Sequence, residues 1–243
     1  MIDTPQKPTE VLELQKELQA KGEVKYVVNT EPHPDHFTGN YFFQAPVLAH
    51  KGARNAILKY PLQALVDRTN ELDLEGRPLM HEYTIKLPEI TFSDWLAINL
   101  GEHTIELIYC PGHTPSEAVV YIPQEGVIFS GDNVVYKVKA WLHDALPEEW
   151  IASLKKLRAL EADIIVPGHG DDICSMDYLS QQEALISNWT KAVKSAIKAG
   201  LNEEQALANI GNPDPFPMPK GCKAMAPQVD KMIIEHLFQL YRE

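Results

Sequence analysis

The sequence predicts an α/β fold in which helices cover a sheet. Short runs rich in β-branched residues alternate with segments whose apolar residues recur at helical spacing over residues 8–175. Helical patterns dominate residues 176–243, which predicts a helical C-terminal tail. The composition is typical of a globular protein, with 44% hydrophobic and 23% charged residues. We therefore expect a single domain over residues 1–243, in which the C-terminal helices pack on a core formed by residues 1–175.

Charge and cysteine usage narrow the class of protein. The formal net charge of −12 disfavours nucleic-acid binding, which needs a basic surface to neutralise phosphates. Cys110, Cys174 and Cys222 are odd in number and widely spaced, as is typical of free thiols in a reducing compartment. The sequence shows neither a signal-peptide pattern at Met1–Glu10 nor an apolar run long enough for a membrane span. These observations predict a cytoplasmic protein that binds neither nucleic acid nor membranes.

The N-terminal half alternates between helix and strand signals. Pro8–Ala20 is predicted to be a helix, because Val11, Leu14 and Leu18 share one face and Gly22 suits its C-terminal cap. The other predicted elements are strands at Val24–Asn29, Ala45–Ala49, Ile90–Leu100 and His103–Tyr109, helices over Lys51–Leu72 with a break at Pro61, and an irregular polar stretch at Glu71–Pro88.

The second half begins with a predicted hairpin and becomes helical. Pro147 is expected to start a helix, since Glu148 and Glu149 in its first turn complement the helix dipole. Asn202 and Gln205 form a pattern typical of a capping box at a later helix start. The remaining predicted elements are strands at Ala118–Ile122, Gly126–Ser130 and Ile164–Val166, a helix that ends at Gly200, a loop at Asn212–Pro219 and a helix at Gln228–Tyr241.

The segment after the Val24–Asn29 strand is dense in potential metal ligands. Six residues contain four of them: Glu31, His33, Asp35 and His36. Pro32 and Pro34 favour extended conformations, in which alternate side chains point the same way, so residues 31, 33 and 35 are expected to converge. A plain polar loop is the alternative, but ligand residues at this density are typical of a metal site.

This segment, NTEPHPDHFTGN, resembles the metal-binding motif of the metallo-β-lactamase superfamily, Thr-His-x-His-x-Asp-His followed by a nearby Gly. Glu31 stands where the family usually has its first His. Three later motifs follow in the family's order, each after an apolar, strand-like run. They are CPGHTPSE with His113, FSGDN with Asp132 and VPGHGD with His169. The resemblance covers residues 1 to about 175.

The resemblance implies an αβ/βα sandwich with two metal ions in a cleft. It assigns Glu31, His33 and His113 to one metal, Asp35, His36 and His169 to the other, and Asp132 as the bridge between them. Zn²⁺ is the expected metal, with Mn²⁺ or Fe²⁺ as alternatives. Met1–Thr4 resembles the end of the family's second strand, so the first strands are expected to be missing. The sheet edge left open in this way would favour a homo-oligomer.

The resemblance also implies a reaction. A metal-bound hydroxide, oriented by Asp35, would attack an acyl bond of a small-molecule ester, lactone, thioester or β-lactam. An Asp at position 132 resembles the pattern of the glyoxalase II, lactonase and general-hydrolase branches. Tyr136 and His143 are candidate proton donors, and the alternative for each is a packing or loop role. Two other functions stay open: a mononuclear iron enzyme like the superfamily's persulfide dioxygenases, and a non-catalytic homologue.

Four histidines have no ligand spacing. We expect His50, His81 and His103 to be solvated, and His236 to have a structural role on the last helix.

Overall fold

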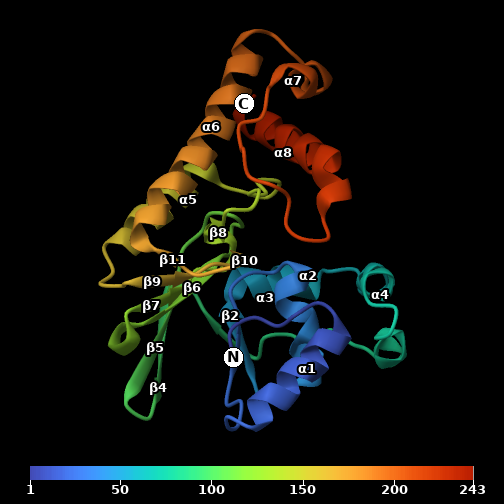
Figure 1. Ribbon diagram of the computed structural model, residues 1–243, viewed down its shortest axis with the longest axis vertical. Helices are drawn as coiled ribbons and strands as arrows, with labels where there is room; N and C mark the ends of the chain where they lie inside the picture. Colours follow the sequence, from blue (N-terminus) through green and yellow to red (C-terminus); the bar gives the residue numbers. More distant parts are fainter. Residues whose placement is uncertain (243) are drawn as a thin grey trace. The chain divides into compact units, whose positions relative to one another are not determined.

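The computed structural model describes residues 1–242 (Figure 1). The chain divides into two compact units. The first contains Met1–Ile98, Glu106–Tyr109 and Ser116–Val120, and the second contains Asn99–Ile105, Cys110–Pro115 and Tyr121–Glu243. Strands β4 (Trp95–Leu100), β5 (His103–Tyr109) and β6 (Ala118–Ile122) contribute residues to both units. Among the helices of residues 1–242, none combines the length and the apolar composition that a membrane span requires.

The first unit is built on a parallel sheet with the order β1-β2-β3. The chain register places Val27 opposite Val47 and Leu48 opposite Ile90. Every residue of the first two strands is buried. The elements of this unit are α1 (Pro8–Gln19), β1 (Val27–Asn29), α2 (Pro34–Phe37), η1 (Thr38–Phe42), β2 (Val47–His50), α3 (Lys51–Leu58), α4 (Leu62–Leu72), η2 (Arg77–Met80) and β3 (Ile90–Phe92).

The start of the chain runs beside β1. Ile2 forms a parallel bridge with Val28, whose N–H donates to the carbonyl of Met1 at 3.0 Å. The N–H of Asp3 in turn donates to the carbonyl of Val28 at 2.7 Å. This pairing carries the Asp3 side chain to the end of β1, where the ligand segment begins. The homo-oligomer expected from an open sheet edge stays a prediction.

A hydrophobic cluster packs against α2, which carries part of the ligand segment. It contains Phe37, Ile57, Leu65, Met80 and Tyr83, all buried. The hydroxyl of Tyr83 donates to the carbonyl of Thr38 at 3.1 Å, and burial raises the pKa of this phenol. The stretch expected to be polar and irregular therefore buries two large side chains, at positions 80 and 83, against α2.

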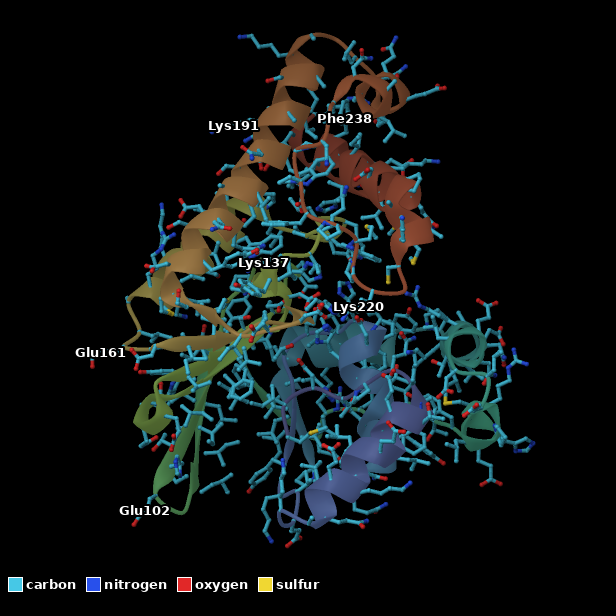
Figure 2. All side chains as sticks on the ribbon, viewed as in Figure 1. Glu102, Lys137, Glu161, Lys191, Lys220 and Phe238 are labelled. Atoms are coloured by element: carbon cyan, nitrogen blue, oxygen red, sulfur yellow. The ribbon has the colours of Figure 1, made fainter. Side chains whose placement is uncertain are left out.

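The second unit holds short strands and the C-terminal helices. Strand β7 pairs in parallel with β9, and β11 pairs antiparallel with β9. Trp150, Trp189 and Phe238 are fully buried among the helices; Phe238 is labelled on α8 in Figure 2. The elements are η3 (Pro123–Glu125), β7 (Val127–Phe129), η4 (Gly131–Asn133), β8 (Val135–Tyr136), α5 (Pro147–Arg158), β9 (Ile164–Val166), β10 (His169–Gly170), β11 (Cys174–Ser175), η5 (Met176–Tyr178), α6 (Leu179–Lys198), α7 (Glu203–Asn209), η6 (Lys223–Met225) and α8 (Ala226–Tyr241).

Most predicted elements are confirmed. The α/β alternation, the break between α3 and α4, the start of α5 at Pro147 and the helical tail all appear. Asn202 and Gln205 form the capping box. Cys110, Cys174 and Cys222 are free thiols.

The structure also corrects the predictions for Ile90–Leu100 and for His50. The single strand expected at Ile90–Leu100 is two strands: β3 pairs with β2, and the chain turns before β4 begins at Trp95. His50, expected to be solvated, is 5% exposed and stacks on the ring of Tyr109 with centroids 4.2 Å apart. Burial lowers the pKa of His50. Its position at the end of a fully buried strand explains the difference.

Candidate metal centre

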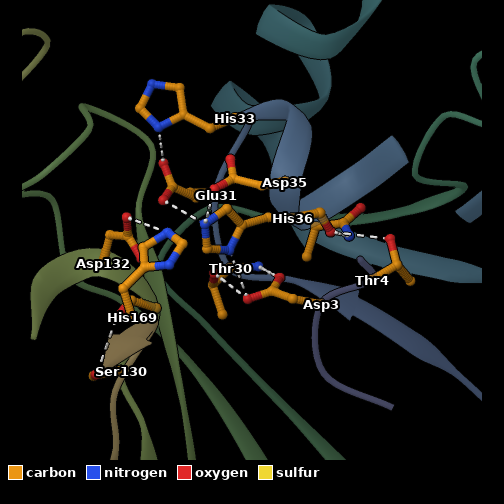
Figure 3. Close-up of polar contacts among 12 residues, drawn as sticks. Asp3, Thr4, Thr30, Glu31, His33, Asp35, His36, Ser130, Asp132 and His169 are labelled. Carbon is orange, nitrogen blue, oxygen red and sulfur yellow. Dashed lines mark hydrogen bonds and ion pairs between the residues drawn. The ribbon is translucent and has the colours of Figure 1, made fainter. Parts of the chain in front are cut away.

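Glu31 is the centre of the ligand cluster in the first unit (Figure 3). Its side chain is fully buried. Oε2 lies 2.7 Å from Nδ1 of His33, and Oε1 lies 3.2 Å from Nε2 of His36. The convergence of residues 31 and 33 is therefore confirmed, and a buried carboxylate lies between two imidazoles.

Asp35 reaches this cluster by a different route from the one predicted. Pro34 starts the short helix α2, so Asp35 and His36 lie on a helical turn and not on an extended strand. Proline suits the first helical position, where no backbone N–H is needed and φ is already set. The carboxylate of Asp35 is 43% exposed, and its Oδ2 lies 4.0 Å from Nε2 of His36. The predicted alternation thus holds for residues 31 and 33 only.

Asp3 orients the ring of His36, and sequence reasoning missed it. Oδ2 of Asp3 lies 3.0 Å from Nδ1 of His36. Thr30 fixes the carboxylate, because its backbone N–H and its hydroxyl donate to Asp3 at 2.8 and 2.7 Å. A carboxylate on one ring nitrogen of a histidine directs the other nitrogen toward a metal. The only sequence signal was the apolar-Asp-Thr pattern of residues 2–4, which suggested a strand end but not this role.

The backbone around His36 is also fixed by side chains. Its carbonyl accepts from Nδ2 of Asn29 at 2.8 Å and from the hydroxyl of Thr4 at 3.2 Å. Asn40 donates to Oδ1 of Asn29 at 2.7 Å. Gly39 allows the chain to pass closely, since a Cβ there would lie 2.8 Å from the carbonyl oxygen of residue 5. The cluster therefore rests on a buried polar network.

Asp132 is the centre of the ligand cluster in the second unit. Its Oδ2 lies 3.3 Å from Nε2 of His169 and 3.7 Å from Nε2 of His113. Asp132 and His113 are buried, whereas the side chain of His169 is 35% exposed. One carboxylate oxygen thus faces two imidazoles. The bridging role of Asp132 stays a prediction. Figure 3 shows the contact with His169.

Asn133 links the loops that carry these ligands. Its Oδ1 accepts from the backbone N–H of His113 at 3.1 Å, and its Nδ2 donates to the carbonyl of Cys110 at 2.6 Å. Its own carbonyl accepts from Nε1 of Trp150 at 2.9 Å. Sequence reasoning missed this role as well, because the contacts span about twenty residues and leave no local pattern.

The two candidate proton donors lie beside predicted ligands. The ring of His143 is 6.0 Å from that of His113 and 5.9 Å from that of Trp141, measured between centroids. Tyr136 pairs with Gly170, next to His169, in the β8–β10 ladder. The ammonium of Lys137 lies 4.6 Å from the ring of Tyr136. A hydrogen bond with the Tyr136 side chain raises the pKa of Lys137. Catalytic roles for His143 and Tyr136 stay predictions.

The donor set fits divalent metal ions. Four imidazoles and three carboxylates are the ligands that zinc takes in proteins, and carboxylates also suit manganese and iron. Within residues 1–242, every group of side chains that could hold a metal ion is drawn from the seven predicted ligands, His143 and Asp144. In each unit a buried carboxylate contacts two imidazoles. This arrangement is typical of side chains that bind a cation together.

Comparison with known proteins decides the family. The profile of the metallo-beta-lactamase superfamily matches residues 2–169. The chain belongs to this superfamily. The match includes all seven predicted ligands and ends before α6. Members of the superfamily generally bind metal ions, which agrees with the donor set.

Individual relatives share little sequence identity with this chain. The chain is 25% identical over 191 residues to a linear primary-alkylsulfatase of a Pseudomonas species, covering 65% of this chain and 36% of that protein. It is 28% identical over 159 residues to a hydroxyacylglutathione hydrolase of Maricaulis maris, covering 65% and 52%. The chain thus spans about a third to a half of the length of these two relatives.

The fold class predicted from the sequence is confirmed by a solved structure. A metallo-beta-lactamase family protein from Thermus thermophilus superimposes with a TM-score of 0.69 at 17% identity, covering 98% of this chain and 84% of that one. At this identity the likeness establishes the fold alone. It extends over the C-terminal helices, which the superfamily profile does not cover.

Proposed function

We propose that this chain is a metal-dependent hydrolase that cleaves an acyl bond of a small molecule. In this proposal two divalent ions are held by the ligand set of the superfamily: Glu31, His33, Asp35, His36, His113, Asp132 and His169. The observation that carries it is the pair of buried carboxylates, Glu31 and Asp132, each of which contacts two imidazoles. Buried carboxylates of this kind are costly unless cations or donors compensate them.

The chemistry divides between the ions and the side chains. Two divalent ions, when bound, lower the pKa of water and offset negative charge on a substrate oxygen. Asp35 is the ligand best suited to orient the attacking water and accept its proton, because its carboxylate is 43% exposed while Glu31 is fully buried. The proposal therefore separates Asp35, which acts on the water, from Glu31, which compensates charge.

His143 supplies a proton to the leaving group in this proposal. Its side chain is 17% exposed, and its Nε2 lies 3.8 Å from Oδ2 of Asp144. Histidine is the side chain that most often transfers protons in catalysis, and the position of this ring beside His113 suits a proton donor. Tyr136 is the weaker candidate, because a hydrogen bond already joins its side chain to Lys137.

Sulfate-ester hydrolysis is the second candidate. It is favoured by the similarity to a linear primary-alkylsulfatase over 65% of this chain. The ligand set is compatible with either substrate class, since both reactions bring water to an electrophilic centre and release an oxygen, sulfur or nitrogen leaving group.

A substrate screen with a matched pair of variants tests the proposal. Protein loaded with zinc or manganese is assayed against chromogenic esters, lactones, thioesters, a cephalosporin and a primary alkyl sulfate. We expect hydrolysis of one class that disappears after chelation and returns with metal. Asp35→Ala should lose turnover more completely than it loses metal, whereas Asp67→Ala, at an exposed helical position, should match the wild type. Hydrolysis that persists in Asp35→Ala, or that survives chelation, would overturn the proposal.

A further inference from the structure

The loop of residues 137–146 carries His143 and is fastened to the C-terminal part of the chain. We propose that Lys139 is a positioning residue, whose ion pair with Asp230 on α8 holds this loop so that His143 stays against His113. The inference rests on the proposed hydrolysis for its catalytic consequence, but the fastening itself is a property of the fold. It gives the helices beyond the superfamily match a role in the reaction.

Lys139 joins the loop to three separate elements. Its side chain is 7% exposed, and Nζ lies 2.5 Å from Oδ1 of Asp230. The same ammonium lies 5.6 Å from the ring of Trp189 on α6. Its backbone N–H donates to the carbonyl of Pro217 at 2.7 Å. An ammonium buried to this extent is expensive unless it is paired, so Asp230 fixes where the side chain can lie.

The next residue is held by a second acid. Oδ2 of Asp214 accepts from the backbone N–H of Ala140 at 2.8 Å, and Oδ1 accepts from that of Phe216 at 2.9 Å. Asp214 is fully buried, and this burial raises its pKa. The carboxylate therefore connects the loop to the proline-rich segment that contains Phe216.

The far end of the loop is fastened to the same helix. Nε2 of His236 on α8 contacts the carbonyl of Ala145 at 2.7 Å. The N–H of Leu146 then donates to the carbonyl of Gly112 at 2.8 Å, next to His113. Asp230 and His236 are about 9 Å apart along α8, at six positions of helical rise. One helix thus holds the loop on both sides of His143.

The loop also has an apolar anchor that does not depend on the ion pair. Ala140, Leu142 and Ala145 are fully buried. Loss of the Lys139 charge should therefore loosen the first part of the loop and leave the unit folded. The consequence we expect is a change in the position of His143 and not a loss of metal, because the contacts of Asp132 and His169 lie outside this network.

Lys139→Met tests the inference, because methionine keeps much of the apolar stem and removes the charge. Asp230→Asn breaks the pair from the other side and serves if the first variant fails to fold. Arg158→Met is the control: it removes the Arg158–Glu183 pair of 2.9 Å between α5 and α6, in the same unit but outside the loop. Each variant is examined by amide hydrogen exchange over residues 137–146, metal content, and the dependence of kcat on pH.

We expect faster exchange over residues 137–146 in Lys139→Met and in Asp230→Asn, with metal content unchanged. The value of kcat should fall by about tenfold or more, since general acid catalysis is worth at least that much. Its pH profile should come to match that of His143→Ala. In the double variant Lys139→Met/His143→Ala, kcat should be no lower than in His143→Ala alone, whereas Arg158→Met should resemble the wild type throughout.

Unchanged exchange in this loop would overturn the inference, and so would additive losses of kcat in the double variant. If the wild type hydrolyses none of the substrates, the proposed function fails, while the exchange measurement still decides whether Lys139 fastens the loop.

Discussion

Gly168 offers a test of how tightly the fold constrains Asp132. It lies between β9 and β10, and its N–H donates to the carbonyls of Gly131 and Val134 at 2.9 and 3.1 Å. A Cβ at this position would lie 2.0 Å from Oδ1 of Asp132 and 2.8 Å from the carbonyl oxygen of Gly131. In Gly168→Ala, either the carboxylate or the backbone that carries it must therefore move.

The magnitude follows from these distances. The carboxylate must shift by about 1 Å or more to restore an ordinary contact. Overpacking of this kind costs about 1–3 kcal/mol of unfolding free energy. A shift of this size also spoils the geometry of a metal ligand, and the disturbance of ligand orientation typically lowers metal affinity by about 10–100-fold. We expect Gly168→Ala to show both effects.

The assay compares Gly168→Ala with Gly211→Ala in thermal unfolding and in competition with a chelator. Gly211 is a matched control, because a Cβ there meets nothing within 4 Å and its φ lies outside the left-handed region. Its replacement by alanine should be neutral or slightly stabilising. Wild-type metal affinity in Gly168→Ala would refute the constraint that we assign to this position.

Three further substitutions probe the ligand clusters and the first unit. Asp3→Asn should lower metal affinity by about 10–100-fold, because it removes the carboxylate that orients His36. The backbone should be unaffected, because asparagine tolerates the φ of 52° at this position; unchanged chelator competition would contradict this. Glu31→His leaves two negative ligands where there were three, so we expect retained metal and a rate that turns on at lower pH; metal gained only in the variant would show that Glu31 is not a ligand. Burial raises the pKa of Asp73, but hydrogen bonds from Thr9 and from the backbone N–H of Gly76, together with the charge of Lys7, outweigh it and lower the pKa overall. The Asp73 carboxylate therefore stabilises the fold above pH about 4, and this contribution is lost as pH falls through the folded pKa. The stability difference between Asp73→Asn and the wild type, measured by urea unfolding, should be present at pH 7 and vanish in acid; a difference that persists well below the folded pKa would contradict this.

The features that could be predicted from the sequence are those set by short stretches of chain. Glu31 and His33 converge because the prolines between the ligands restrict a short stretch of backbone. The later candidate ligands His113, Asp132 and His169 could be named from motif order alone.

What the sequence did not reveal depends on contacts between residues that are distant in the chain. Asp3 contacts His36, which lies 33 positions away in the sequence. Lys139 forms an ion pair with Asp230, which is also far away in the sequence. His50 was expected to be solvated because its sequence neighbours give no sign of the Tyr109 ring stacked on it. The helical turn at Asp35 was missed because Pro34 suits both an extended segment and a helix start.

The most direct test of the proposed metal centre is the number of metal ions per chain, measured by elemental analysis after reconstitution and removal of excess metal. We expect two divalent ions, with zinc as the preferred metal. We also expect that His33→Ala in the first unit and His113→Ala in the second each lower this number, because both residues belong to the proposed ligand set. A single iron per chain, or a count that neither substitution changes, would contradict the proposal.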